Sequence, residues 1–411
     1  MEKNIAVVRG DYSSPEIIEQ TLRVLDAVAD KYGHKFNYVD ASVGGAAIDK
    51  FGEPLPKTEF DKCIVSDAVL MGSVGGPKWK DLPAEKRPET ALEKLRIGMG
   101  LYTNIKYAKL WPQISSLSPL KETIVGKGVD YIILRELSSG VYYGKHETIQ
   151  LESNMEYAYD VMQYDSKEIE RISHMAFKFA MKRRKKCCLV TKSSVLDTGK
   201  LWQKVATEVS KLYPEVIFSE MSVEDCAITL NRTPAQFDVV LTENMFGEIL
   251  SSQASVNTGS FGMVPSISMN DKYFGLFGTT LGSSPENAGK DISNPLACVL
   301  SAAIMLKYSF DMKKEAEDLE RAVERVLDRG YRTPDIMSDG GMLVGTRGMG
   351  EALVAEVTGE SEAKSFEALK EVQKILGGTT PPPPKKEEEP ALEETEESSE
   401  PEQEKTEEKS E

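Results

Sequence analysis

One stretch in the second half of the chain, residues 238–255, constrains the fold more than any other. It opens with an apolar run at residues 239–241, bounded by polar residues, which is typical of a short buried strand. A turn at residues 242–244 follows, and a helix then begins. Glu248 and Ser252 lie four residues apart on that helix, so both side chains are expected on one face. Strands and helices alternate along the rest of the chain too, which predicts an α/β fold. One helix is expected to begin at Ser14, which would cap it, and a long amphipathic helix is expected over residues 166–184.

Length and composition indicate a globular protein outside the membrane. The 411 residues are enough for two domains and a sizeable core, and 40% hydrophobic with 28% charged residues is ordinary for this class. No apolar run approaches the roughly 18 residues that a membrane helix needs. The strand-like residues 5–8 follow the first methionine too closely for a signal peptide. We therefore expect a cytoplasmic protein with no membrane partner.

The cysteines agree with that location. None of the five lies in a C-x-x-C pair or beside a cluster of histidines, so reduced thiols are expected and a zinc site is not. The five are Cys63, Cys187, Cys188, Cys226 and Cys298.

The net charge of −16 is unevenly distributed. Residues 379–411 hold 13 glutamates and 4 lysines, a net charge of −9, which leaves −7 for residues 1–378. Nucleic acid requires a basic surface, so no nucleic-acid partner is expected. The glutamate-rich end cannot bury enough apolar area to order itself, and a disordered acidic tail is predicted over residues 379–411.

The stretch described first resembles the signature of the metal-dependent β-decarboxylating dehydrogenases, the isocitrate and isopropylmalate dehydrogenase family. The family pattern is close to T-E-N-L-F-G-D-I-L-S-D-E-A-S, and residues 242–255 read T-E-N-M-F-G-E-I-L-S-S-Q-A-S. Both aspartates of the family bind Mg²⁺ or Mn²⁺, and here their positions are Glu248 and Ser252. The third carboxylate comes from the neighbouring subunit, and its position here is Glu224. Because Mg²⁺ requires near-octahedral geometry at about 2.0–2.1 Å, three changed ligands predict a weakened metal site.

Other motifs extend the resemblance to about residue 357, and several resemble the isopropylmalate branch in particular. That branch acts in leucine biosynthesis. Residues 67–79 read D-A-V-L-M-G-S-V-G-G-P-K-W, a strand followed by a glycine-rich loop. Residues 134–144 read L-R-E-L-S-S-G-V-Y-Y-G, where the family has R-E-L-T-G-G-I-Y-F-G. Glu93 stands where that branch places an apolar residue against the substrate's isopropyl group.

The resemblance assigns substrate-binding and catalytic roles to five residues. Three cations, Arg96, Lys106 and Arg135, occupy the positions of three arginines that hold the substrate's carboxylates. The planar fork of arginine matches a carboxylate bidentately, whereas Lys106 keeps the charge and loses the fork. Lys192 is expected to reach the partner subunit's site and accept the hydroxyl proton, and Tyr142 to reprotonate the product.

The resemblance also implies a site for NAD. Residues 275–295 follow the family's cofactor loop, although two of its residues, a glutamate and a histidine, are Gly278 and Leu281 here. Its retained scaffold includes Gly282, Ser283 and Asn294. Glu286 replaces the aspartate that holds the adenosine ribose, and an acidic group there would accept hydrogen bonds from the ribose and repel a 2′-phosphate. The chain contains no G-x-G-x-x-G dinucleotide motif.

The resemblance implies two α/β domains and a dimer. Residues 1–101 and 257–357 are expected to form one discontinuous, cofactor-binding domain, and residues 102–256 a domain for substrate, metal and dimerisation. An additional helix is predicted over residues 358–378, before the acidic tail. A homodimer is expected because Lys192 and Glu224 would complete the neighbour's site.

Three functions remain open at this point. The first is NAD-dependent oxidative decarboxylation of a 2-hydroxy-dicarboxylate of the isopropylmalate type. The second is a catalytically impaired paralogue that serves as a structural or regulatory subunit in a hetero-oligomer with a related chain, which the altered metal positions favour. The third, favoured by Glu93 and Lys106, is a dehydrogenase for a different small 2-hydroxy acid.

Overall fold

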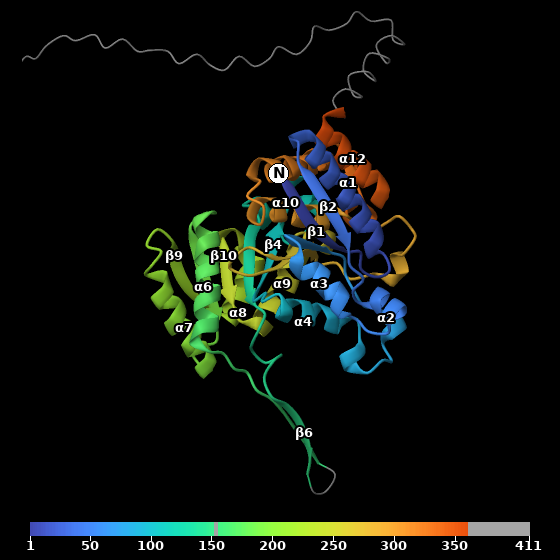
Figure 1. The fold of residues 1–411 in the computed structure, drawn as a ribbon. Coiled ribbons are helices and arrows are strands. Elements are labelled where there is room, and N and C mark those ends of the chain that lie inside the picture. The colour runs from blue at the N-terminus through green and yellow to red at the C-terminus, as the bar shows by residue number, and fades with distance from the viewer. Residues whose placement is uncertain (152–154, 361–411) are drawn as a thin grey trace, which may run out of the picture. The chain divides into compact units, whose positions relative to one another are not determined.

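The computed structural model describes residues 1–151 and 155–360, and its core is a ten-stranded mixed sheet covered by helices (Figure 1). The expected mixed α/β class is confirmed. The structure describes only the first three residues of the additional helix predicted over residues 358–378. The rest of that helix and the predicted tail lie outside the described residues. None of the described helices is long and apolar enough to cross a membrane.

The strands of the large sheet pair in the order β2-β1-β3-β12-β11-β4-β5-β10-β8-β9. In chain order they are β1 (Glu2–Val8), β2 (Lys35–Asp40), β3 (Ala68–Met71), β4 (Thr103–Lys109), β5 (Asp130–Glu136), β8 (Lys186–Thr191), β9 (Ile217–Ser222), β10 (Val239–Thr242), β11 (Pro265–Met269) and β12 (Gly275–Thr279). The strands on both flanks are parallel, whereas β12, β11, β4 and β5 run antiparallel in the centre. Strands from residues 2–71 and 265–279 therefore form one side of the sheet, strands from residues 103–242 form the other, and the two sides meet where β11 pairs with β4.

Twelve α-helices surround this sheet in the described part of the chain. They are α1 (Ser14–Tyr32), α2 (Gly45–Phe51), α3 (Lys57–Val65), α4 (Glu89–Gly98), α5 (Glu122–Val125), α6 (Ser166–Met181), α7 (Asp197–Ser210), α8 (Val223–Arg232), α9 (Asn244–Asn257), α10 (Leu296–Tyr308), α11 (Lys313–Asp328) and α12 (Thr346–Thr358). Helix α10 is buried along nearly its whole length and contacts α11, β11 and β12.

Strand β1 shows why the sheet needs helices on both faces. Ile5 and Val7 belong to the large core cluster that includes α1 and α10, whereas Ala6 and Val8 belong to a second cluster with α3 and α4. Successive side chains of a strand point to opposite faces, so a continuous apolar run such as residues 5–8 is buried on both.

The start of α1 differs from the sequence prediction. Ser14 was expected to cap the helix, but it is the first helical residue, and the capping position is Ser13. The Ser13 hydroxyl makes no capping bond; it donates to the Ser283 carbonyl at 2.8 Å, from a loop distant in sequence. The long-range contact therefore replaces the local cap. The predicted capping role of Ser14 is wrong, although the helix begins where expected.

Two smaller pairs of strands lie apart from the large sheet. Strands β13 (Tyr331–Arg332) and β14 (Met342–Leu343) form one, and β6 (His146–Gln150) and β7 (Glu156–Asp160) form an antiparallel hairpin. Figure 1 shows the β6–β7 hairpin projecting away from the helices and the sheet. The division into two domains, at residues 101–102 and 256–257, remains a prediction.

Candidate active site

Three cationic side chains gather at the centre of the sheet. Arg96 comes from α4, Lys106 from β4 and Arg135 from β5, the strand that pairs with β4. A cavity of about 270 Å³ is lined by Arg96 and Lys106 and by the glycine-rich loop that follows β3. Like charges this close repel each other, so the cluster favours an anionic ligand.

Lys106 is partly buried among these charges. Its ammonium group donates to the hydroxyls of Ser266 (2.8 Å) and Thr280 (2.9 Å), and it has no carboxylate partner among the described residues. Burial, followed by the charges of Arg96 and Arg135, lowers the pKa of Lys106 to about 7. Lys106 is therefore close to its titration point at neutral pH.

Arg135 is held by the start of α9. Its Nε and Nη2 donate to the Asn244 side-chain oxygen at 2.8 and 2.6 Å, and its Nη1 pairs with the Glu248 carboxylate. The guanidinium also lies 5.8 Å from the centre of the Tyr142 ring. Burial, followed by the charge of Arg96, lowers the pKa of Arg135 to about 10, which leaves it charged at neutral pH. The structure thus brings Tyr142 and Glu248 to the cation cluster.

Lys192 and Glu224 lie elsewhere. They follow β8 and β9, form an ion pair with each other, and do not line the cavity of Arg96 and Lys106. The Lys192 pairing lowers the pKa of Glu224. Both side chains remain accessible, with 28% of Lys192 and 54% of Glu224 exposed. This placement is compatible with the expectation that both serve a neighbouring subunit, which remains a prediction.

The predicted cofactor loop lines the same cavity. Gly282 and Leu281 line it together with Gly278 and Thr279 at the end of β12. A Cβ atom added to Gly282 would meet nothing within 4 Å, so the backbone there borders open space. The cavity therefore connects the cation cluster to the predicted cofactor loop.

The other three loop residues differ in accessibility. Glu286 is exposed. Ser283 is buried and donates to the Gly75 carbonyl at 2.9 Å. Asn294 is also buried, and its amide donates to Asp335 at 3.1 Å and accepts from the Leu296 backbone at 2.9 Å. Ser283 and Asn294 thus fix the shape of the loop, and Glu286 is the one of the three that is open to a ligand.

Comparison with known proteins identifies the family. The family profile described as "Isocitrate/isopropylmalate dehydrogenase" matches residues 4–353. The chain belongs to this family. The 3-isopropylmalate dehydrogenase of Clostridium acetobutylicum is 48% identical over 356 residues, which cover 87% of this chain and 99% of that protein. The 3-isopropylmalate dehydrogenase of Aquifex aeolicus is 48% identical over 343 residues, covering 84% and 94%.

Solved structures agree with the family assignment. The isocitrate dehydrogenase of Methylococcus capsulatus superimposes with a TM-score of 0.76 at 29% identity, covering 87% of this chain and 99% of that one. A β-decarboxylating dehydrogenase of Thermococcus kodakarensis gives a TM-score of 0.71 at 29% identity, covering 91% and 98%.

The metal positions depart from the family's donor set. The Glu248 carboxylate is paired with Arg135, and the Ser252 hydroxyl donates to the Glu248 backbone carbonyl at 2.9 Å. Within the described residues, no group of three or more His, Cys, Asp or Glu side chains could hold a metal ion. As arranged in one chain, these residues do not fit a divalent cation.

Sequence reasoning missed the residues that position the site. Asn244 holds Arg135 and also donates to the Ser139 carbonyl at 2.8 Å. Buried Asp11 accepts backbone hydrogen bonds from Gly45, Ala46 and Gly75 at 2.8–2.9 Å, which fixes the loops beside the cavity. Burial raises the pKa of Asp11 despite these bonds. The one available signal was Asn244 itself, a polar residue placed directly after a buried strand.

Proposed function

We propose that the chain is a subunit of a 3-isopropylmalate-type dehydrogenase, which oxidises and decarboxylates a 2-hydroxy-dicarboxylate with NAD. The observation that carries this proposal is the single cavity shared by Arg96, Lys106 and the loop around Gly282. Such a cavity can hold an acidic substrate beside a cofactor. The two relatives named 3-isopropylmalate dehydrogenase, each 48% identical, support the choice of substrate.

The three cations would bind and orient the substrate. A dianion entering the cavity would offset the mutual repulsion of Arg96, Lys106 and Arg135, and arginine can hold a carboxylate through two parallel hydrogen bonds. Among the described residues, Arg96 donates only to Ser268, at 3.3 Å, through Nε, so its two terminal nitrogens remain available. Arg135 would exchange Glu248 for a substrate carboxylate.

Two further residues would move protons. Oxidation of the hydroxyl-bearing carbon releases a hydroxyl proton, which Lys192 of the neighbouring subunit would accept. Departure of CO₂ leaves an electron pair on the substrate carbon, and Tyr142 would donate the proton that quenches it. Tyr142 is 48% exposed and its ring centre lies 5.8 Å from the Arg135 guanidinium, which supports this role.

NAD, when bound, would supply the acceptor for the hydride. Of this chain's residues, Gly282 would allow close approach of the cofactor, and Glu286 would accept hydrogen bonds from its ribose and disfavour a 2′-phosphate. Mg²⁺ or Mn²⁺ is part of the proposal only through the family, because Glu224, Glu248 and Ser252 do not form a cage within one chain. No step is therefore assigned to a metal.

The proposed active form is a homodimer. Ile249 and Val256 lie on the same exposed face of α9 as Ser252, with 58% and 47% of their surface accessible, and Ile228 of the adjoining helix α8 is 54% exposed. Burying such a stripe against a second copy would bring the partner subunit close to Glu248. The β6–β7 hairpin, with exposed Tyr157 and Ile149, offers a second apolar surface.

The decisive experiment is NADH production by the purified full-length chain over a panel of 2-hydroxy acids, with and without Mg²⁺ or Mn²⁺. We expect turnover of 3-isopropylmalate, no turnover by an Arg96→Ala variant, and unchanged turnover by Lys57→Ala, which removes an exposed lysine on α3. Preference for another 2-hydroxy acid would favour the third function, a dehydrogenase for a different substrate, which Glu93 and Lys106 suggested. Absence of turnover with every acid, together with stable binding to an active related subunit, would replace the proposal with a non-catalytic role.

A further inference from the structure

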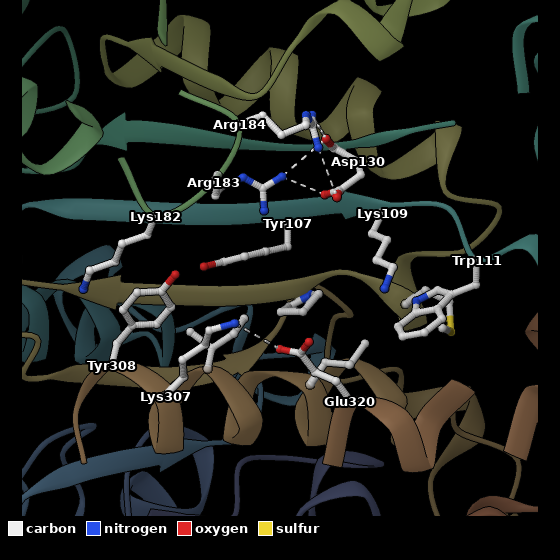
Figure 2. A pocket seen from close by; sticks show the side chains of 14 residues that line it. Tyr107, Lys109, Trp111, Asp130, Lys182, Arg183, Arg184, Lys307, Tyr308 and Glu320 are labelled. Atoms are coloured by element: carbon white, nitrogen blue, oxygen red, sulfur yellow. Dashed lines mark hydrogen bonds and ion pairs between the residues drawn. The ribbon is translucent and has the colours of Figure 1, made fainter. Parts of the chain in front are cut away.

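A second cavity, of about 290 Å³, lies on the opposite face of the sheet from the candidate active site (Figure 2). Strand β4 shows the relationship, because its successive side chains point to opposite faces: Lys106 lines the active-site cavity, whereas Tyr107 and Lys109 line the second one. Strand β11 shows the same alternation, because Pro265 lines the second cavity and Ser266 lines the active-site cavity. The rest of this rear cavity is formed by β5, the end of α6, α10 and α11.

The rear cavity carries an excess of positive charge. Five cations and two acids line it, although residues 1–378 as a whole are acidic. The cations are Lys109, Lys182, Arg183, Arg184 and Lys307, and the acids are Asp130 and Glu320.

The two arginines are already paired with carboxylates of the protein. Arg183 pairs with Asp130 at 2.7 Å and with buried Asp238 at 2.8 Å, and these partners raise its pKa against the opposing effect of burial. Arg184 also pairs with Asp130, at 3.2 Å. Neither arginine needs a ligand.

Two of the lysines have weaker ion-pair partners than the arginines, or none within the described residues. Lys182 has no carboxylate within ion-pairing distance in the described part of the chain, and its ammonium group lies 5.0 Å from the centres of the Tyr273 and Tyr308 rings. Burial lowers the pKa of Lys182, as do the charges of Lys313 and Lys307, while Asp311 opposes them. Among the described residues, the one ion-pair partner of Lys307 is Glu320, at 3.9 Å. Lys182 and Lys307 are therefore able to bind a further anion.

One buried donor in the cavity wall lacks a partner, and a second has only Tyr308 close by. The Trp111 indole N–H has no hydrogen-bond partner among the described residues. The Tyr107 hydroxyl makes no hydrogen bond within standard distance and angle limits there, although it lies close enough to the Tyr308 hydroxyl for each to affect the pKa of the other. Figure 2 shows Tyr107 and Tyr308 pointing toward each other, next to Lys182. Burial raises the pKa of Tyr107 and of Tyr308, so both hydroxyls keep their protons and can donate. Leaving a buried donor unpaired is costly, and a ligand with acceptor oxygens would remove that cost.

A simpler explanation accounts for only part of this arrangement. Lys182 caps the end of α6 and Lys307 lies in the last turn of α10, where cations are favoured by the helix dipole. That explanation does not account for the unpaired Trp111 N–H, for the poorly paired Tyr107 hydroxyl or for the cavity itself. The wall also contains Leu300, Ile304 and Met263, which suit an apolar body.

We propose that the rear cavity is an effector site for a small organic dianion that carries an apolar or aromatic body. Its acidic group would bind between Lys182, Lys307 and the Tyr107 hydroxyl, and its body would pack against Leu300 and Ile304. Because β4 contacts this ligand through Tyr107 and the substrate cavity through Lys106, occupancy of one site acts on the strand that forms the other. The proposed binding does not depend on the proposed catalytic function.

Phenyl phosphate is a suitable probe, because it combines a dianion with an aromatic ring. Calorimetric titration of the full-length chain should show binding that is tighter than that of inorganic phosphate, which lacks the ring. Lys182→Ala should weaken the binding at least about tenfold, and Tyr107→Phe about fivefold, while Lys57→Ala should leave it unchanged. The Tyr107→Phe variant keeps the ring in the wall and so controls for folding.

Two controls separate this site from the active site. Lys106→Met removes a cation from the substrate cavity and should not weaken phenyl phosphate binding at the rear cavity. In the active protein, phenyl phosphate should change the KM of the hydroxy acid, and the Lys182→Ala variant should lose that response. The proposal is overturned if phenyl phosphate does not bind, if inorganic phosphate binds equally well, or if Lys106→Met rather than Lys182→Ala abolishes binding. Each of these binding results stands even if the chain shows no turnover.

Discussion

At the scale of single residues, the buried ammonium group of Lys106 has the clearest functional consequence. Its pKa is lowered to about 7, so it is charged below that pH and increasingly neutral above it. The unfolded chain keeps an ordinary lysine pKa of about 10.4. Between these two values the unfolded state holds the proton and the folded state does not. The cost of burying this charge is therefore fully present below pH 7 and is relieved as the pH rises.

The same titration predicts pH-dependent substrate binding. From pH 6 to pH 8 the charged fraction of Lys106 falls roughly tenfold, so the dissociation constant of 3-isopropylmalate, measured by calorimetry without NAD, should rise with pH. Lys106→Arg should remove this dependence, because an arginine stays charged throughout and restores a bidentate fork. Binding that is flat with pH in the original chain would show that Lys106 does not contact the substrate.

The close packing of Gly247 against Arg135 predicts a second effect on the same cation cluster. A Cβ atom at this position would lie 2.6 Å from Cγ and 2.7 Å from Cβ of Arg135, so the arginine would have to move. Overpacking of this kind costs about 1–3 kcal/mol, and Gly247→Ala should weaken substrate binding by about tenfold. Gly348→Ala on α12 is the control, because it adds a Cβ atom outside the cavity, where the nearest atom is Cβ of Val344 at 3.2 Å. Equal binding by the two variants would argue against a role for Arg135.

At the scale of elements, helix α9 carries two of the three positions that depart from the family's metal ligands. Shortening one side chain and adding a carboxylate, in the double variant Glu248→Asp, Ser252→Asp, should tighten Mn²⁺ binding by about 10–100-fold. The double variant Glu248→Asn, Ser252→Asn has the same side-chain sizes as the aspartate variant without its charges and should not. Mn²⁺ titration followed by electron paramagnetic resonance measures both. Equal Mn²⁺ affinity in the original chain and the aspartate variant would show that the site is not built at this helix.

Much of the element pattern could be predicted from the sequence, because short apolar runs and helical periodicity are local signals. Strand β10 and helix α9 appear where residues 239–255 predicted them. The errors come from contacts between distant segments. Ser13 donates to Ser283 rather than capping α1. The helix expected to reach residue 184 ends at Met181. Beyond it, Arg183 turns to Asp130 and Asp238.

The candidate site, too, could be predicted only in part from the sequence. The motifs predicted that Arg96, Lys106 and Arg135 belong together, and the structure brings all three to the centre of the sheet. The pairing of Glu248 with Arg135 was not predictable, since it depends on the packing of α9 against β5. The rear cavity was also missed. Its basic residues come from β4, from α10 and from the segment after α6, which are far apart in the sequence and meet only in the folded structure.

At the scale of the whole molecule, the proposed dimer makes a prediction that one chain alone cannot satisfy. If Lys192 acts in the neighbour's site while Arg96 acts in its own, two inactive variants should complement each other. In a mixed dimer of Lys192→Met and Arg96→Ala chains, one site would contain both original residues and the other site neither. After refolding an equal mixture, about half of the dimers are mixed and about a quarter of all sites are intact. NADH production should therefore recover to about a quarter of that of the original protein, whereas each variant alone stays inactive. No recovery in a mixture whose dimers are shown by mass spectrometry to be mixed would place Lys192 in the same chain's site.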